Sequence, residues 1–232
     1  MSYRLNIAGE PVQLRPSGTL WLEQYRTLVV ADLHLEKGSA YAARGQLLPP
    51  YDTRETLHRL QTELHATLAE TLVLLGDSLH DMAAISRIAE HERQTLIDLA
   101  KSVELIWISG NHDPDGGSAF GGHSADEVTL GHLTLRHEPR IGRQTGEVAG
   151  HLHPCAKLTG PAGSLRRRCF ISDDTRIILP AFGAYTGGLN VKDGAFAGLF
   201  PSPPCAYLLG SHVTPIPFAR LIPDAKRHTS KR

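Results

Sequence analysis

Cysteine and long apolar segments are scarce in this sequence of 232 residues. The three cysteines lie far apart and form no C-x-x-C pair, which argues against a disulfide framework or a cysteine-based zinc site. No apolar run approaches the roughly 18 residues of a membrane helix. Polar residues interrupt the N-terminal segment MSYRLNIAGE where a signal peptide would need an unbroken apolar stretch. We therefore expect a cytoplasmic protein with no membrane partner.

Net charge is also absent, because 24 Lys and Arg balance 24 Asp and Glu. The balance hides a difference between the two halves of the chain. Residues 1–115 contain 10 basic and 16 acidic residues, whereas residues 116–232 contain 14 and 8. Such a difference points to a charged site or partner, so a neutral total does not exclude nucleic acid.

The composition is that of a globular protein, with 41% apolar and 21% charged residues. No linker of low complexity divides the chain, so we expect a single domain over residues 1–221 and a basic, disordered tail over residues 222–232. Histidine is abundant, with 13 residues against 6 Phe, 6 Tyr and 2 Trp. Because imidazole is the commonest metal ligand, this excess raises the question of a metal site.

Three short apolar runs in the first half predict strands buried on both faces. They are TLVVAD (27–32), TLVLLGD (71–77) and VELIWISGN (103–111). Apolar residues at helical spacing lie between them, over 57–68 and 85–99, and Asp52 is a candidate N-terminal cap for the first helix. This alternation predicts a largely parallel sheet. The second half has short strand-like runs with frequent turns, including EVTLG, LTLRH, RCFIS and AFAGLF, and predicts a second, antiparallel sheet.

Metal-binding residue types follow the predicted strands. The motifs are Asp32-Leu33-His34, Gly76-Asp77, Gly110-Asn111-His112-Asp113, His137 and Gly150-His151-Leu152-His153. Side chains two apart on a strand share a face, so each D-x-H or H-x-H pair could reach one site. Ligands bind beyond the carboxyl ends of strands in open α/β sheets. Carboxylates, imidazoles and an amide oxygen form a mixed set that suits Mn, Fe, Zn or Co.

These five motifs, in this order, resemble the calcineurin-like binuclear metallophosphoesterase superfamily. The resemblance implies an α/β fold, a four-layer αββα sandwich of two packed mixed sheets flanked by helices. It implies two divalent transition-metal ions and attack by a metal-bridging hydroxide. The implied ligands of one ion are Asp32, His34 and His153, those of the other are Asn111, His137 and His151, and Asp77 bridges the two.

The resemblance also implies that His112 faces the leaving group as a proton donor. Either Asp113 or Asp81 could orient it. Phosphoprotein phosphatases carry a carboxylate three residues after the bridging Asp, whereas this chain has His80, as in the DNA-repair nuclease branch. His80 could place His112, contact a phosphodiester or be a surface residue.

A narrower likeness involves LPAFGAYTGGLNV (179–191), which resembles the bacterial ligase-associated DNA damage response endonucleases. This implies a manganese-dependent endonuclease that prefers single-stranded DNA, encoded beside a repair ligase, a helicase and an exonuclease. Lys37, Arg166 and Arg168 are candidate phosphate contacts. Phe182 and Tyr185 are candidates for base stacking. A homodimer is left open.

The residues alone leave two alternatives to a DNA endonuclease. One is a phosphomonoesterase or a cyclic-nucleotide phosphodiesterase of the same fold. The other is a non-catalytic scaffold for repair proteins.

Overall fold

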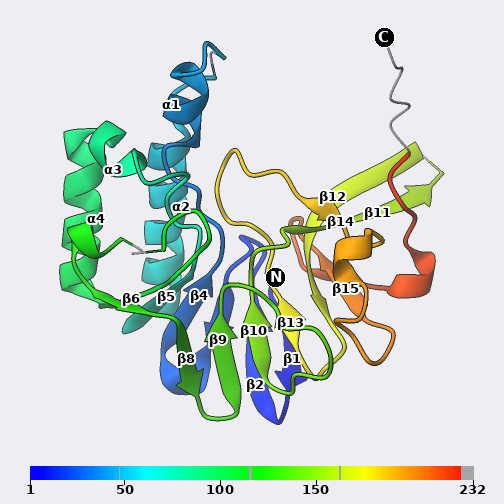
Figure 1. Ribbon diagram of the computed structural model, residues 1–232. Helices are drawn as coiled ribbons and strands as arrows, with labels where there is room; N and C mark the ends of the chain where they lie inside the picture. Colours follow the sequence, from blue (N-terminus) through cyan, green and yellow to red (C-terminus); the bar gives the residue numbers. More distant parts are fainter. Residues whose placement is uncertain (47, 115–116, 162, 226–232) are drawn as a thin grey trace.

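The computed structural model describes residues 1–46, 48–114, 117–161 and 163–225, which form two packed β-sheets with helices on one outer face (Figure 1). Seven strands in sequence order form the first sheet: β1 (Tyr3–Ile7), β2 (Glu10–Leu14), β3 (Leu20–Leu22), β4 (Thr27–Val30), β5 (Thr71–Leu75), β6 (Glu104–Ile108) and β7 (His123–Ala125). The strands β4 to β7 are parallel and β1 to β4 antiparallel, so this sheet is mixed.

The second sheet has the strand order β14-β11-β12-β13-β10-β9-β8, with β15 and β16 added beside β12. Its strands are β8 (Glu127–Leu130), β9 (Leu133–Arg136), β10 (Glu147–Ala149), β11 (Pro154–Gly160), β12 (Gly163–Ser172), β13 (Ile177–Ile178), β14 (Leu189–Asn190), β15 (Cys205–Leu208) and β16 (Thr214–Pro217). The prediction of an antiparallel sheet is wrong at its centre, because β10 is parallel to both β9 and β13. The run AFAGLF is also not a strand: it begins in the 3-10 helix Gly194–Phe196.

The main core lies between the sheets and explains the unbroken apolar runs. Val29 and Val73 point into this core with Leu135 and Val148 of the second sheet. The alternate residues of the same strands, such as Leu72, point to the opposite face. The central strands β4 and β5 are thus buried on both faces and carry no polar alternation.

Helices cover the outer face of the first sheet, where Leu57, Leu60, Leu96 and Leu99 pack on it. They are α1 (Lys37–Ala42), α2 (Asp52–Thr67), α3 (Ala84–Arg87) and α4 (Glu90–Ser102). Asp52 is not a cap: it is the first residue of α2, and its carboxylate accepts a hydrogen bond from the Gly38 amide at 2.9 Å. No described helix is long and apolar enough to cross a membrane.

The outer face of the second sheet is covered, in the described part of the chain, by short 3-10 helices rather than by α-helices. A third apolar cluster lies there, and it includes Phe196 and Leu221 beside the 3-10 helices Gly194–Phe196 and Phe218–Arg220. The two packed mixed sheets are therefore confirmed, with 3-10 helices as the described helical segments of the fourth layer. Of the predicted tail, residues 226–232 lie outside the described residues, and the Ile222 amide donates to the Lys157 carbonyl at 2.9 Å.

Candidate metal centre

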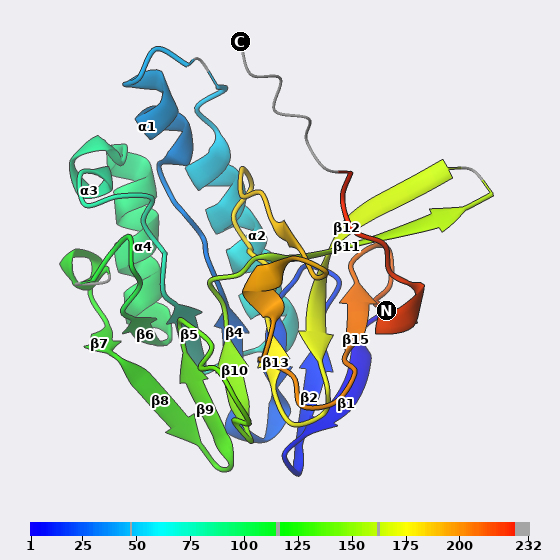
Figure 2. The same cartoon turned by 45° about the vertical axis from the view of Figure 1, so that its right-hand side comes forward.

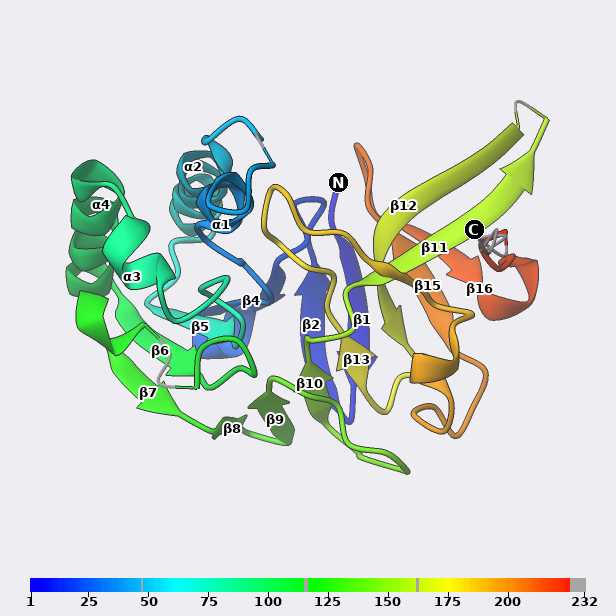
Figure 3. The same ribbon diagram turned by 45° about the horizontal axis from the view of Figure 1, so that its top comes forward.

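Each of the five motifs follows the carboxyl end of a strand, and the strands concerned are parallel within each sheet. Asp32, Asp77 and Asn111 follow β4, β5 and β6, while His137 and His151 follow β9 and β10. Parallel strands end at the same edge, so both sheets present their motifs at one end of the molecule. The turned view in Figure 3 looks onto this end.

The backbone at the site residues is not the extended backbone of a strand, on which the prediction of a shared face was based. The following site residues have left-handed φ values between 45° and 68°: Asp32, His34, Asp77, His151 and His153. They belong to loops beyond the strands, so alternation on a strand does not explain their convergence. A left-handed conformation costs a non-glycine residue about 1 kcal/mol or more. Five such residues at one place are typical of a functional site, where the surrounding structure holds the strain.

The first cluster contains Asp32, His34 and His153. The Nε2 atoms of His34 and His153 are 3.3 Å apart, and His153 Nε2 is 3.4 Å from Asp32 Oδ1. Asp32 is fully buried and also accepts the His151 amide. Burial, with further contributions from His153 and Lys37, lowers the pKa of His34 to about 2, which keeps this imidazole neutral.

The second cluster contains Asp77, His137 and His151, with Asn111 beside them. His137 Nδ1 is 2.8 Å from the Leu75 carbonyl oxygen. A carbonyl can only accept, so Nδ1 carries the proton of this bond, and in the neutral form of the ring Nε2 presents a lone pair. That Nε2 lies 3.0 Å from Asn111 Oδ1 and 3.1 Å from His151 Nδ1.

Acceptors therefore face acceptors in the second cluster. His137 Nε2 and Asn111 Oδ1 point lone pairs at the same space, and Asp77 Oδ1 lies 3.5 Å from His137 Nε2. Such an arrangement is unfavourable alone and favourable around a cation. The mixed nitrogen and oxygen donors fit a divalent transition metal.

Asp77 lies between the two clusters. Its Oδ1 is near His137, and its Oδ2 is 3.8 Å from His34 Nε2. The carboxylate is 3% exposed, and Oδ1 also accepts the His112 amide at 3.0 Å. Gly110 explains the close approach of these loops, because a Cβ at this position would overlap the Asp77 backbone nitrogen and the Asp77 Oδ1 atom.

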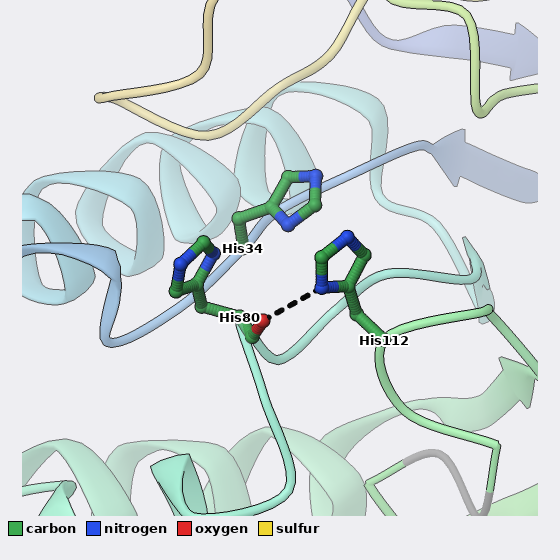
Figure 4. A group of neighbouring side chains, drawn as sticks. All are labelled: His34, His80 and His112. Atoms are coloured by element: carbon green, nitrogen blue, oxygen red, sulfur yellow. Dashed lines mark hydrogen bonds between the residues drawn. The ribbon is translucent and has the colours of Figure 1, made fainter. Parts of the chain in front are cut away.

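His112 is half-exposed at the mouth of this centre. Its Nδ1 lies 2.9 Å from the His80 carbonyl oxygen, drawn as a dashed line in Figure 4, so Nδ1 donates this bond. The Nε2 atom is then 3.9 Å from Asp77 Oδ2. The His80 ring stacks on the His112 ring, with centroids 5.8 Å apart and planes 18° apart. The contact that orients His112 is the main chain of His80.

Neither predicted carboxylate takes that place. Asp113 is 1% exposed, and its Oδ2 accepts the amides of Ser78 at 2.8 Å and Leu79 at 3.0 Å. Burial raises the pKa of Asp113 to about 6, against the opposing effect of these two hydrogen bonds. Asp81 pairs with Arg87 at 2.8 Å. Asp113 therefore holds the loop that follows Asp77.

The predicted phosphate contacts divide into different environments. Lys37 is half-buried and lies by the histidine cluster, where burial lowers the pKa of both His34 and His80 and the Lys37 charge adds to the effect. Arg166 is exposed at the edge of the second sheet and bonds to Asp224 and the Gly188 carbonyl. Arg168 donates to the Ala181 carbonyl at 2.9 Å, which is a structural contact rather than a free phosphate ligand.

The segment 179–191 packs directly on the metal centre. The Phe182 amide donates to the Ala31 carbonyl and the Gly183 amide to the Asp32 carbonyl. Arg59 also donates to the Phe182 carbonyl at 3.0 Å. Phe182 is fully buried, so its prediction as a stacking residue is wrong, whereas Tyr185 is half-buried. Sequence reasoning missed Arg59, which sits on α2 and carries no motif.

No family model and no curated protein matches the chain. Among solved structures, a nuclease MPE from Pseudomonas putida is 28% identical and has a TM-score of 0.71, with 93% of this chain and all of that chain covered. A phosphoesterase, Yfce from E. coli, is 15% identical with a TM-score of 0.39, over 78% of this chain and 87% of that chain. In its two-sheet fold and in the five motifs that converge on one centre, the chain is similar to the metallophosphoesterase superfamily, and its likeness to the Pseudomonas putida nuclease extends over 93% of its length.

Proposed function

We propose that this protein is a binuclear metal-dependent phosphodiesterase that cuts DNA internally, preferably single strands, during DNA repair. The observation that carries the proposal is the position of Asp77 between two donor clusters, with His112 facing the same carboxylate. One ion would be held by Asp32, His34 and His153, and the other by Asn111, His137 and His151. Asp77 would bind both.

The donor sets fit two divalent cations, with manganese as the first candidate. When bound, such ions lower the pKa of a water molecule and neutralise charge on phosphoryl oxygens. The protein itself orients the ligands. The Leu75 carbonyl holds the His137 ring, and the His151 amide holds Asp32. These contacts leave the donor atoms directed into the centre.

His112 would supply the proton for the leaving oxygen. Its Nδ1 is occupied by the His80 carbonyl, so the second ring nitrogen is the one that can give and take a proton. His112 and Asn111 are both exposed at the mouth, which leaves room for a polymeric substrate.

DNA is supported as the substrate by two observations. The similar structure from Pseudomonas putida is described as a nuclease. His80 also stands three residues after Asp77, where phosphoprotein phosphatases have a carboxylate. A repair role in the cytoplasm, with a ligase, a helicase and an exonuclease as partners, rests on the resemblance of segment 179–191.

The test compares three substrates with Mn²⁺: circular single-stranded DNA, bis-p-nitrophenyl phosphate and p-nitrophenyl phosphate. We expect cleavage of the circle, which has no ends, and of the diester. Robust turnover of the monoester without DNA cleavage would support the phosphomonoesterase alternative. An inactive protein with every divalent metal would support the scaffold.

Two variants test the assigned residues. Asp77→Ala is expected to abolish hydrolysis, because one carboxylate serves both ions. His112→Ala is expected to lose about 100-fold or more on DNA. The loss should be smaller on bis-p-nitrophenyl phosphate, whose leaving group needs little protonation. His91→Ala, at an exposed position on α4, is the matched control. Equal activity of wild type and His112→Ala would refute the proton-donor role.

A further inference from the structure

A two-stranded ribbon extends from the metal centre. The strand β11 begins at Pro154, directly after His153, and β12 returns beside it. Among described residues, Ala156–Gly160 pair only with Gly163–Arg167, and β12 joins β15 from Cys169 onward. Figure 2 shows the ribbon projecting from the body at the end that carries the metal centre. Seven residues of strand span about 20 Å.

The two faces of the ribbon differ in chemistry. Lys157 lies opposite Arg166 in the strand register, so both occupy one face together with Arg168. The other face carries Arg167 opposite Ala156, and Leu165 opposite Leu158. Ala156 belongs to the apolar cluster on the outer side of the second sheet, so this face of the ribbon is continuous with that cluster.

The face with Lys157 and Arg166 is turned toward segment 179–191. Arg166 Nη2 donates to the Gly188 carbonyl at 2.6 Å, and Arg168 donates to the Ala181 carbonyl. Arg166 also pairs with Asp224 at 3.3 Å, but this pair is exposed to solvent and weak, so a phosphate can replace the Asp224 carboxylate. Gly183, in the same segment, bonds to the main chain of Asp32. A pocket of about 550 Å³ lies between the ribbon and this segment, with Arg166, Arg167, Arg168 and Thr186 among its lining residues. The segment that lines this basic hollow also bonds to the main chain of Asp32.

We propose that this ribbon holds the sugar–phosphate backbone of the DNA on one side of the scissile phosphate, through Lys157 and Arg166. The inference rests on the proposed function as a DNA nuclease. Lys157 and Arg166 are partners in the strand register, so they would contact one or two neighbouring phosphates. Such contacts do not depend on base sequence, and only a strand long enough to reach from the metal centre to the ribbon can make them. Arg168 is a positioning residue that joins the ribbon to segment 179–191.

The experiment measures kcat/KM for oligonucleotides of 4 to 30 nucleotides and for bis-p-nitrophenyl phosphate. It uses the full chain, the double variant Lys157→Gln/Arg166→Gln and the control Lys101→Gln, which removes an exposed positive charge on α4, away from the ribbon (Figure 1). For the double variant we expect the ratio of long-DNA to bis-p-nitrophenyl phosphate activity to fall about tenfold. The slope of log kcat/KM against log salt should decrease by about 1.4, or 0.7 for each lost contact to a single strand. In wild type, activity should rise with length until the DNA covers the ribbon.

The outcomes separate the two hypotheses. An unchanged ratio in the double variant, or an equal fall in Lys101→Gln, would overturn the ribbon proposal while DNA cleavage by wild type stands. A double variant that changes only the oligomeric state, measured by light scattering, would show a protein interface and also overturn it. Failure of wild type to cut any DNA, with the small diester still hydrolysed, would instead refute the proposed function.

Discussion

At the scale of single residues, His112 and Asp113 are neighbours in one motif but have different roles. His112 faces the metal centre, whereas the next residue, Asp113, accepts two main-chain hydrogen bonds from the loop after Asp77. That loop also supplies the His80 carbonyl that orients His112. Asp113 thus affects the centre through the backbone of this loop. Replacing it should lower the free energy of unfolding more than it lowers the rate of hydrolysis.

We expect Asp113→Ala to lower the free energy of unfolding by about 2–4 kcal/mol, because the Ser78 and Leu79 amides lose their buried acceptor. Asp113→Asn keeps one carbonyl oxygen and should lose about 1 kcal/mol. Urea denaturation gives both values. Asp113→Asn should also retain most of the phosphodiesterase turnover. A 100-fold loss of turnover at nearly wild-type stability would instead make Asp113 a catalytic residue.

At the scale of elements, the segment 179–191 connects α2, the ribbon and the metal centre. Arg59 and Arg168 both donate to its carbonyls. Gly183 allows the closest contact, since a Cβ there would overlap the Leu33 carbonyl oxygen. Leu33 lies between the ligands Asp32 and His34, so any displacement of this segment moves a ligand loop.

Gly183→Ala is therefore expected to destabilise the fold by about 1–3 kcal/mol, as for other overpacked sites, and to weaken metal binding. Gly187→Ala is the matched control, because nothing lies within 4 Å of a Cβ at Gly187. Thermal unfolding and isothermal titration with Mn²⁺ measure the two effects. Equal behaviour of the two variants would show that the segment does not support the ligand loop.

At the scale of the whole molecule, the metal centre joins the two sheets. Asp32, His34, Asp77 and Asn111 follow strands of the first sheet, while His137, His151 and His153 come from the second. The buried carboxylates of Asp32 and Asp77 lie among neutral imidazole nitrogens. Bound cations would offset this desolvated negative charge and hold the two sheets together.

Metal binding should therefore stabilise the entire domain. At 100 times its dissociation constant, Mn²⁺ adds about 2.7 kcal/mol to the free energy of unfolding, which raises the melting temperature by about 5–10 °C for a chain of this length. Differential scanning calorimetry after removal of metal with EDTA measures the change. Asp77→Ala should show little response to Mn²⁺. If no divalent cation shifts the wild-type transition, the centre does not bind metal in solution.

The sequence by itself determined the order of the buried strands and which residues meet at the candidate metal centre. Its unbroken apolar runs predict strands buried on both faces, and strand ends in a parallel sheet meet at one edge. Asp32, Asp77 and Asn111 could therefore be brought together without coordinates. The resemblance to the superfamily rests on the five motifs in order, because no single motif is specific.

Only the tertiary structure decided how these residues meet and what surrounds them. Left-handed backbone at Asp32 and His153, the turn of Asp113 away from His112, and the use of Arg168 on carbonyls depend on contacts between segments far apart in the chain. Local sequence patterns carry the period of a strand or helix. They do not carry the direction in which a loop side chain finds its hydrogen-bond partner, since that partner belongs to another part of the fold.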